Sequence, residues 1–309
     1  MLLAAHALGY VPNAAARSLV SGISHTIALV IPHNEHIRVD AFIPGLLGSI
    51  NSYCHAHGFT VLLEAVEDVS EPGAYLRLVD SRRIDGLIML NPRQQEDPHL
   101  LELARNRFPL ILFGAQEVKH PEIYSISTDN RKAGRLATSH LLALGHRQIA
   151  HLSFASLDYL GALARWQGYQ DALLEYGVAP DSRLVAYGDF SAESGYRAMR
   201  DLLELGQRPT ALFAGNDIIA FGAMRAILEC GLRIPQDIAV IGFDDMPLSE
   251  FATPPLSTIR TDPQIQGALA AQMLLQLIRG ETPATQHVVL GTELIVRASC
   301  GAIPIGMHR

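Results

Sequence analysis

Short, fully apolar runs alternate along the chain with longer segments in which apolar residues recur every three or four positions. The short runs predict buried strands, and the longer segments predict amphipathic helices. Because the strands are apolar throughout rather than alternating with polar residues, both of their faces should be covered by helices. We expect strands at residues 26–32, 60–66, 86–91, 109–114, 124–129, 148–153, 183–189, 210–216 and 238–245. The pattern therefore predicts an α/β fold with parallel sheets.

Two of the helical segments show which side they are expected to bury. The segment 42–58 places on one side Phe42, Leu46, Ile50 and Tyr53. The segment 130–146 places on one side Leu136, His140, Leu141 and Leu144. The strands fall into two sets on either side of residues 144–153, and a chain of 309 residues favours two domains over one. Open α/β domains bind ligands at the carboxyl ends of their strands, so a cleft between two such domains would suit a small molecule.

Polar residues stand where several predicted strands end. These residues are Asp129 and Asn130, Asp189 with Phe190, Asn216 and Asp217, and Asp244 and Asp245. A carboxylate at this position either caps the following helix or accepts hydrogen bonds from a ligand hydroxyl. Two adjacent aspartates exceed what one cap requires, so we expect one of Asp244 and Asp245 to face the cleft.

Arg165 and two aromatic residues extend this candidate site. The guanidinium of Arg165 has five donors in one plane, which suits vicinal hydroxyls or a carboxylate, although an arginine near a helix start is also an ordinary surface residue. Phe42 and Phe190 offer flat apolar faces for the C–H side of a sugar ring, and core packing is the alternative for each. Together these residues favour a polyhydroxylated ligand.

Composition and charge restrict the remaining function classes. The chain is 49% hydrophobic and 18% charged, as globular proteins are, and its formal net charge of −7 means that any contact with nucleic acid must be local. Three distant cysteines fit a reducing cytosol, and no apolar run is long enough for a membrane span. The apolar start "MLLAAHALG" imitates a secretory signal only loosely, because it has no Lys or Arg before Arg17.

Signals for catalysis and for metals are weak. The sequence has no G-x-S-x-G, no phosphate-binding G-x-x-x-x-G-K-[ST] and no H-E-x-x-H. The clusters "HNEH" and "CHAH" are weak metal candidates, and nothing pairs the aspartates with a nucleophile. We expect no enzymatic activity, no metal and no cofactor.

Seven stretches resemble, in order and over essentially the whole chain, the lactose-repressor (LacI) family of transcription regulators. They are "LGYVPNAAARSL", "RRIDGLIML", "STDNRKAGRLATSHLLALGHRQIAHLS", "ARWQGYQDAL", "GDFSAESGYRAM", "AGNDIIAFGAMRAILECGLRIPQDIAVIGFDD" and "PPLSTI". The resemblance implies two flavodoxin-like subdomains joined by three crossovers, as in periplasmic sugar-binding proteins, with an effector between them. We expect a DNA-binding remnant and hinge at 1–23, an N-terminal subdomain at 24–146 and 260–280, and a C-terminal subdomain at 147–259 and 281–309.

The resemblance also assigns roles by motif. Arg165 and Asp244 match the main polar contacts to the effector, Asn216 its amide contact, Phe42 and Phe190 its stacking residues, and Tyr159 a variable effector position. Arg93 lies in a segment similar to regulators of α-glucoside use and is expected to line the cleft. The hinge helix corresponds to Asn13, Ala14, Ala15, Arg17, Ser18 and Leu19, with Leu19 wedged into the minor groove. We expect this helix to be disordered or loosely formed without DNA.

The family pattern differs from this sequence at two places. The chain begins in what resembles the last helix of the family's helix-turn-helix head, so we expect it not to read an operator specifically by itself. The first cleft loop, "PHNEHIRVDAF", is longer and more polar than in the family. Its His36 and Arg38, with Arg93 and Arg165, make an acidic sugar an alternative to the favoured α-glucoside or disaccharide.

These features predict a cytoplasmic homodimeric repressor that binds operator DNA in the full-length protein and a sugar in its cleft. The dimer candidates are residues 42–58 and 71–83, and the sequence leaves open whether the sugar is an inducer or a corepressor. The alternative is a secreted or periplasmic sugar receptor of a transporter, which shares the fold.

Overall fold

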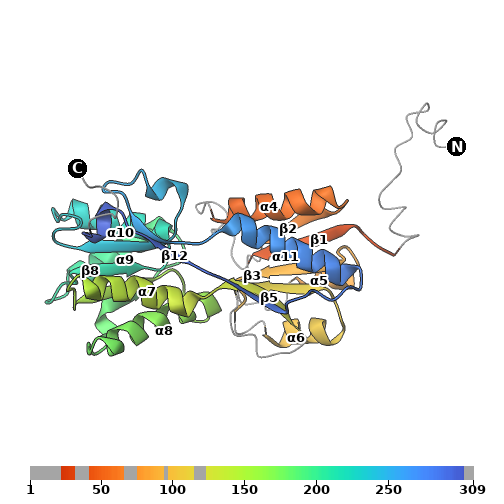
Figure 1. The fold of residues 1–309 in the computed structure, drawn as a ribbon, viewed down its shortest axis with the longest axis horizontal. Coiled ribbons are helices and arrows are strands. Elements are labelled where there is room, and N and C mark those ends of the chain that lie inside the picture. Colours follow the sequence, from red (N-terminus) through yellow and green to blue (C-terminus); the bar gives the residue numbers. More distant parts are fainter. Residues whose placement is uncertain (1–21, 32–41, 66–74, 94–96, 115–122, 303–309) are drawn as a thin grey trace.

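The computed structural model describes residues 22–31, 42–65, 75–93, 97–114 and 123–302. They form two sheets of six strands each, arranged side by side along the long axis of the molecule (Figure 1). Helices cover both faces of each sheet, which explains why the strands are apolar throughout. The predicted α/β fold with two parallel sheets is confirmed.

The first sheet has the strand order β11-β5-β4-β3-β1-β2, and all of its strands are parallel. The strands are β1 (Thr26–Ile31), β2 (Thr60–Ala65), β3 (Gly86–Leu90), β4 (Leu110–Phe113), β5 (Tyr124–Thr128) and β11 (His287–Leu290). Helices α4 (Phe42–Ala56) and α11 (Pro263–Ile278) pack on one face. Helices α5 (Leu76–Asp80) and α6 (Asp97–Arg105) pack on the other.

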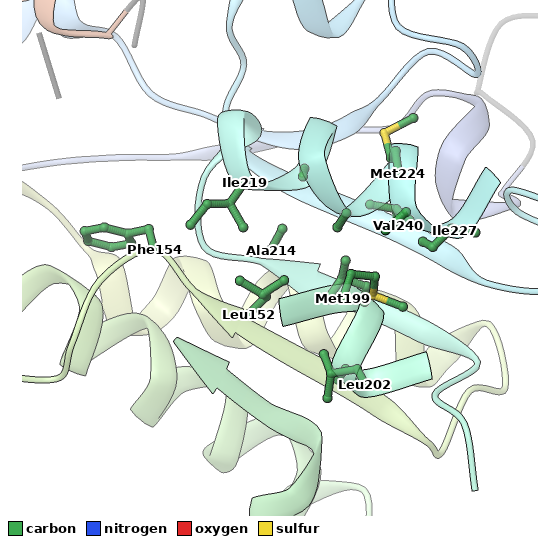
Figure 2. Packing of buried hydrophobic residues seen from close by; sticks show 14 of the residues in the cluster. Leu152, Phe154, Met199, Leu202, Ala214, Ile219, Met224, Ile227 and Val240 are labelled. Atoms are coloured by element: carbon green, nitrogen blue, oxygen red, sulfur yellow. The ribbon is translucent and has the colours of Figure 1, made fainter. Parts of the chain in front are cut away.

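The second sheet has the order β12-β10-β9-β8-β6-β7, in which only the pairing of β12 with β10 is antiparallel. The strands are β6 (Ile149–Ser153), β7 (Val185–Tyr187), β8 (Ala211–Ala214), β9 (Ala239–Asp244), β10 (Ser257–Arg260) and β12 (Glu293–Ile295). Helices α7 (Asn130–Ala143) and α8 (Leu160–Glu175) cover one face. Helices α9 (Ala192–Leu203) and α10 (Asp217–Glu229) cover the other, where Met199 and Ile219 pack against the strand residues Leu152 and Val240 (Figure 2).

Three crossovers join the two subdomains: β5 to α7, β10 to α11, and β11 to β12. The expected boundaries need correction at two of them. Helix α7 packs on α8 and the second sheet, so residues 130–146 belong to the second subdomain rather than the first. Strand β11 pairs with β5, so residues 287–290 belong to the first subdomain rather than the second. Neither change is visible in the local apolar pattern, because both depend on long-range packing.

The buried side of α7 also differs from the expectation. Leu136 and Leu144 are 39% and 40% exposed, whereas the buried side carries small residues such as Ala133, Gly134 and Ala137. A Cβ at Gly134 would lie 2.4 Å from the carbonyl oxygen of Arg165 on α8, so the two helices touch backbone to backbone. This close crossing selects small residues, which an apolar periodicity does not detect. In α4 the expected Leu46 and Ile50 are buried.

The nine predicted strands are all present, each within two residues of its expected ends. The expectation missed β10, β11 and β12, which are three to four residues long. The hinge residues Asn13, Ala14, Ala15, Arg17, Ser18 and Leu19 lie outside the described residues, as do His36 and Arg38. Among the helices that the structure describes, none is both long enough and apolar enough to cross a bilayer.

Candidate functional site

A cleft lies where the carboxyl ends of the two sheets meet. Five of the seven predicted site residues line it: Phe42, Arg165, Phe190, Asn216 and Asp244. The lining also includes residues from both subdomains and from two crossovers, among them Asn91, Thr128, Asn130, Phe154, Thr261 and Gln266. The sequence prediction thus converges on one place, formed by residues that are far apart in the chain.

Arg165 sits at the centre of the polar lining. Its Nε donates to Oδ1 of Asn130 over 2.9 Å, and one Nη donates to the carbonyl of Gly215. The guanidinium carbon stacks 3.4 Å from the ring centroid of Phe243 and 4.6 Å from that of Phe154. The close crossing of α7 and α8 brings Arg165 beside Asn130, the first residue of α7. The cation is therefore held in one orientation before any ligand binds.

Asn216 caps α10 and presents its other amide atom to the cleft. Its Oδ1 accepts from the backbone N–H of Ile219 over 2.8 Å, whereas its Nδ2 forms no hydrogen bond with the described residues. The next residue, Asp217, is buried and accepts from the backbone N–H of Met246 and from the hydroxyls of Ser249 and Thr258 over 2.6 to 2.8 Å. Burial raises the pKa of Asp217 to about 6. Asp217 thus fixes the loop after β9 against the start of α10.

The two adjacent aspartates at the end of β9 have different surroundings, as expected. Asp244 lines the cleft, whereas Asp245 points to the crossovers and pairs with Arg260 and Arg297, each over 2.7 Å. Asp244 has φ of 109° and Asp245 has φ of 55°, both in the left-handed region that costs energy for residues other than glycine. The ion pairs of Asp245 hold this strained turn and keep the Asp244 carboxylate aimed at the cleft.

The aromatic residues of the site form a connected group. The ring of Phe190 meets Phe154 at 5.1 Å and Tyr159 at 5.4 Å, both edge to face, and Phe42 meets Phe113 at 6.1 Å across the first subdomain. Tyr159 and Arg93 do not line the cleft itself. They are buried beside it, where an isolated antiparallel β-bridge joins their backbones and so connects the two subdomains.

Of the lining residues that the sequence did not predict as site residues, three carry polar groups that bear on ligand binding. Asn130, a polar residue at a strand end, accepts a hydrogen bond from the Arg165 guanidinium. Thr261 and Gln266 lie on the crossover into α11, and each is buried with a polar atom, Oγ1 and Nε2, that finds no hydrogen-bond partner among the described residues. An unexplained buried donor in a cleft is a signal for ligand binding, but only packing reveals that it is buried.

Other candidates have structural roles instead. Asp129 caps α7 by accepting from the backbone N–H of Lys132, and Asp189 accepts from Ser191 outside the cleft. Cys54 of the "CHAH" cluster is buried in the core, whereas His55 and His57 are exposed. Among the described residues no three His, Cys, Asp or Glu side chains group as a metal site would require. The described part of the cleft therefore offers hydrogen-bond donors, the Asp244 carboxylate and aromatic faces, which suit a hydroxyl-rich ring.

Comparison with known proteins agrees with this geometry. Residues 138–300 match the model of the periplasmic binding protein-like domain. The transcriptional regulator CelR of Thermobifida fusca is 35% identical over 94% of this chain and 86% of that protein, and the repressor CytR of Escherichia coli K12 is 31% identical over 97% and 86%. The chain belongs to the LacI family of transcriptional regulators.

Two solved structures share the fold of this LacI-family chain. The CelR–cellobiose complex superposes with a TM-score of 0.81 and 32% identity, covering 96% of this chain and 88% of that one. The structure of the lac repressor dimer bound to operator and the anti-inducer ONPF superposes with a TM-score of 0.80 and 30% identity, covering 95% of this chain and 100% of that one. These relatives are transcriptional regulators rather than enzymes or transporter receptors, so the receptor alternative is not favoured.

Proposed function

We propose that this LacI-family regulator binds a neutral sugar, an α-glucoside or another disaccharide, between its two subdomains. The observation that carries the proposal is the convergence of Arg165, Asn216 and Asp244 with the Phe42 and Phe190 rings in one cleft. Guanidinium and amide donors bind sugar hydroxyls, the carboxylate accepts from them, and the aromatic rings stack on C–H faces. The CelR–cellobiose complex supports the choice of a disaccharide.

The charge of the cleft favours a neutral sugar over an acidic one. Among the described lining residues the charged side chains are Arg165 and Asp244, and their formal charges cancel. An acidic sugar would place its carboxylate near Asp244 as well as near Arg165. Arg93, which counted toward the acidic alternative, is buried outside the lining.

We propose that the sugar acts by changing the angle between the subdomains. The cleft has a cavity volume of about 50 Å³, which holds only a few water molecules. A disaccharide therefore requires the subdomains to move apart at the three crossovers and then close on it. A ligand that prefers one arrangement shifts the population toward it, and the proposed hinge at residues 13–19 would transmit this change to operator DNA in the cytoplasm.

We further propose that the chain acts as a homodimer, since paired DNA half-sites require a two-fold axis. Leu248 and Phe251, in the loop after β9, are 61% and 77% exposed, and this supports a dimer surface that includes the second subdomain. Substituting Phe251→Asp should shift the molar mass measured by light scattering from two chains to one. An unchanged mass would place the interface elsewhere.

A thermal-shift screen tests the sugar proposal. The wild type should gain stability with cellobiose or another neutral disaccharide, because a ligand of the folded state raises the apparent stability by mass action. Glucuronate and galacturonate serve as the acidic alternative in the same screen. A shift with these alone would favour the acidic sugar, and no shift with any sugar would contradict the proposal.

A further inference from the structure

One end of the first subdomain carries an excess of positive charge. Because its strands are parallel, the loops that precede β4, β3, β1 and β2 lie next to one another at this end, and α4, α5, α6 and α11 finish there. We call it the basic edge; its exposed cationic residues are Arg82, Arg83, Arg105, Arg107 and Arg279. Four carboxylates, of Asp80, Asp85, Glu102 and Glu281, lie at this end with the five arginines. The edge is thus positive in a chain whose net charge is −7.

The arginines of the basic edge are not neutralised by the protein. None of the five forms an ion pair within the part of the chain that the structure describes. At the corresponding end of the second sheet two arginines are neutralised, since Arg183 pairs with Asp181 over 2.7 Å and Arg233 with Asp237 over 2.9 Å. Arg147 and Arg208 at that end form no ion pair with the described residues, so the first sheet differs in having five such arginines together.

Two of these arginines occupy backbone positions that favour glycine. Arg82 and Arg107 follow α5 and α6 with φ of 54° and 56°, in the left-handed region. The turns after α7, α8 and α10 use glycine for the same conformation, at Gly145, Gly177 and Gly231. A cation near a helix C-terminus is favourable, but an arginine at a neighbouring position with negative φ would supply the same charge without backbone strain. Arg82 and Arg107 therefore place their charge at positions that carry a conformational cost.

The position of the basic edge indicates its partner. Strand β1 begins there, at the outer end of the first subdomain (Figure 1), and its preceding loop lies between the loops before β3 and β2. The Ser24 amide donates to Asp85 over 2.8 Å, and the carbonyl of His25 accepts from Thr60 over 2.8 Å. The residues that precede the core therefore join it in the middle of the basic edge.

We propose that the basic edge contacts the backbone phosphates of the DNA duplex that the regulator binds. The inference rests on the proposed function, in which the residues before the core hold DNA. Guanidinium groups bind phosphate through two parallel hydrogen bonds and do so without regard to base sequence. The strands β4 to β2 span three inter-strand spacings, about 14 Å, which is wide enough to meet several phosphates. The edge contributes affinity and leaves sequence recognition to other residues.

The double variant Arg82→Gly/Arg107→Gly tests the proposal on the full chain. Its melting temperature should equal or exceed that of the wild type, because glycine relieves the left-handed strain. Its affinity for a fluorescent random-sequence duplex should fall at least fivefold at low salt. Across about 50 to 200 mM salt, the log–log slope should become shallower by about 1.8 per bound protomer, or 0.9 for each lost phosphate contact.

Two matched variants separate the charge from its position. Arg82→Lys/Arg107→Lys keeps the charge and should retain most of the duplex affinity. Arg147→Ala/Arg208→Ala removes two exposed arginines near the corresponding end of the second sheet and should bind the duplex as the wild type does. If the glycine variant keeps the wild-type affinity and salt slope, or if the control loses as much, the proposal is wrong. Failure of the proposed function would appear differently, as a wild type that does not bind the duplex at all.

Discussion

Thr261→Val should make the ligand-free protein more stable and its effector binding weaker. The Thr261 hydroxyl is buried, lines the cleft and has no hydrogen-bond partner among the described residues. Valine keeps the branched shape and removes the unpaired polar group. Burying an unpaired hydroxyl costs about 1 to 3 kcal/mol, of which we take the lower end. The expected gain of about 1 kcal/mol corresponds to a rise in melting temperature of about 2 to 4 °C.

The same substitution removes a group that a sugar hydroxyl would bind. One neutral hydrogen bond contributes about 0.5 to 1.5 kcal/mol, so the dissociation constant for the sugar should rise about 2- to 12-fold. Differential scanning fluorimetry without ligand measures the first effect, and calorimetric titration measures the second. The two signs together distinguish a ligand-binding hydroxyl from one that is merely tolerated.

Thr258→Val is the matched control. The Thr258 hydroxyl is also buried but donates to the Asp217 carboxylate over 2.6 Å. Its removal leaves a buried carboxylate with one donor fewer and should lower stability by about 1.5 to 3 kcal/mol. A Thr261→Val protein that melts below the wild type would refute the assignment of an unpaired hydroxyl, and an unchanged sugar affinity would remove Thr261 from the binding site.

Three further substitutions test other parts of the account. Arg165→Met keeps an apolar chain against Phe243 but removes charge-assisted donors that contribute about 1.5 to 3 kcal/mol each, so sugar affinity in calorimetry should fall at least 100-fold. A fall of only threefold would contradict a role for Arg165 as a main polar contact to the sugar. Asp245→Asn breaks a largely buried pair with Arg297 and should lower the urea unfolding free energy by about 2 to 3 kcal/mol, an effect that an unchanged midpoint would contradict. Burial lowers the pKa of His151 to about 4, below its unfolded value, so its neutral form stabilises the fold at neutral pH and this stability is lost as pH falls from about 6.5 to 4. Between pH 7 and 4.5 the unfolding free energy of His151→Gln should therefore fall by about 2.5 kcal/mol less than that of the wild type. If chemical denaturation shows the same fall for both proteins, His151 does not contribute to the loss of stability in acid.

The local sequence pattern predicted those elements that depend on local chemistry. Solid apolar runs identified β1, β3, β4, β5, β6, β8 and β9 because these strands are covered on both faces, and the less buried edge strands β2 and β7 were found from their apolar runs alone. Strands β10, β11 and β12 are short, lie beside the crossovers and include exposed residues such as Arg260 and Val289, so their composition resembles that of loops. Their place in the sheets is decided by partners far away in the chain.

In the candidate site, too, the residues marked by local sequence were predicted and those that depend on distant partners were not. Asp244 and Asn216 were predicted because polar residues after buried strands are conspicuous in the sequence. The partners of Asp245 were not, since Arg260 and Arg297 lie 15 and 52 positions further along the chain and meet it only after the crossovers form. Likewise the buried side of α7 was misassigned because contact through Gly134 depends on α8 rather than on the periodicity of α7.

The most direct test of the central claim is a calorimetric titration of the wild type and Asp244→Ala with the sugar that stabilises the wild type most. We expect one sugar bound per wild-type chain and no measurable binding to Asp244→Ala, with both proteins showing the same circular dichroism spectrum. Equal affinity for the two proteins would mean that the sugar binds outside the cleft between the subdomains.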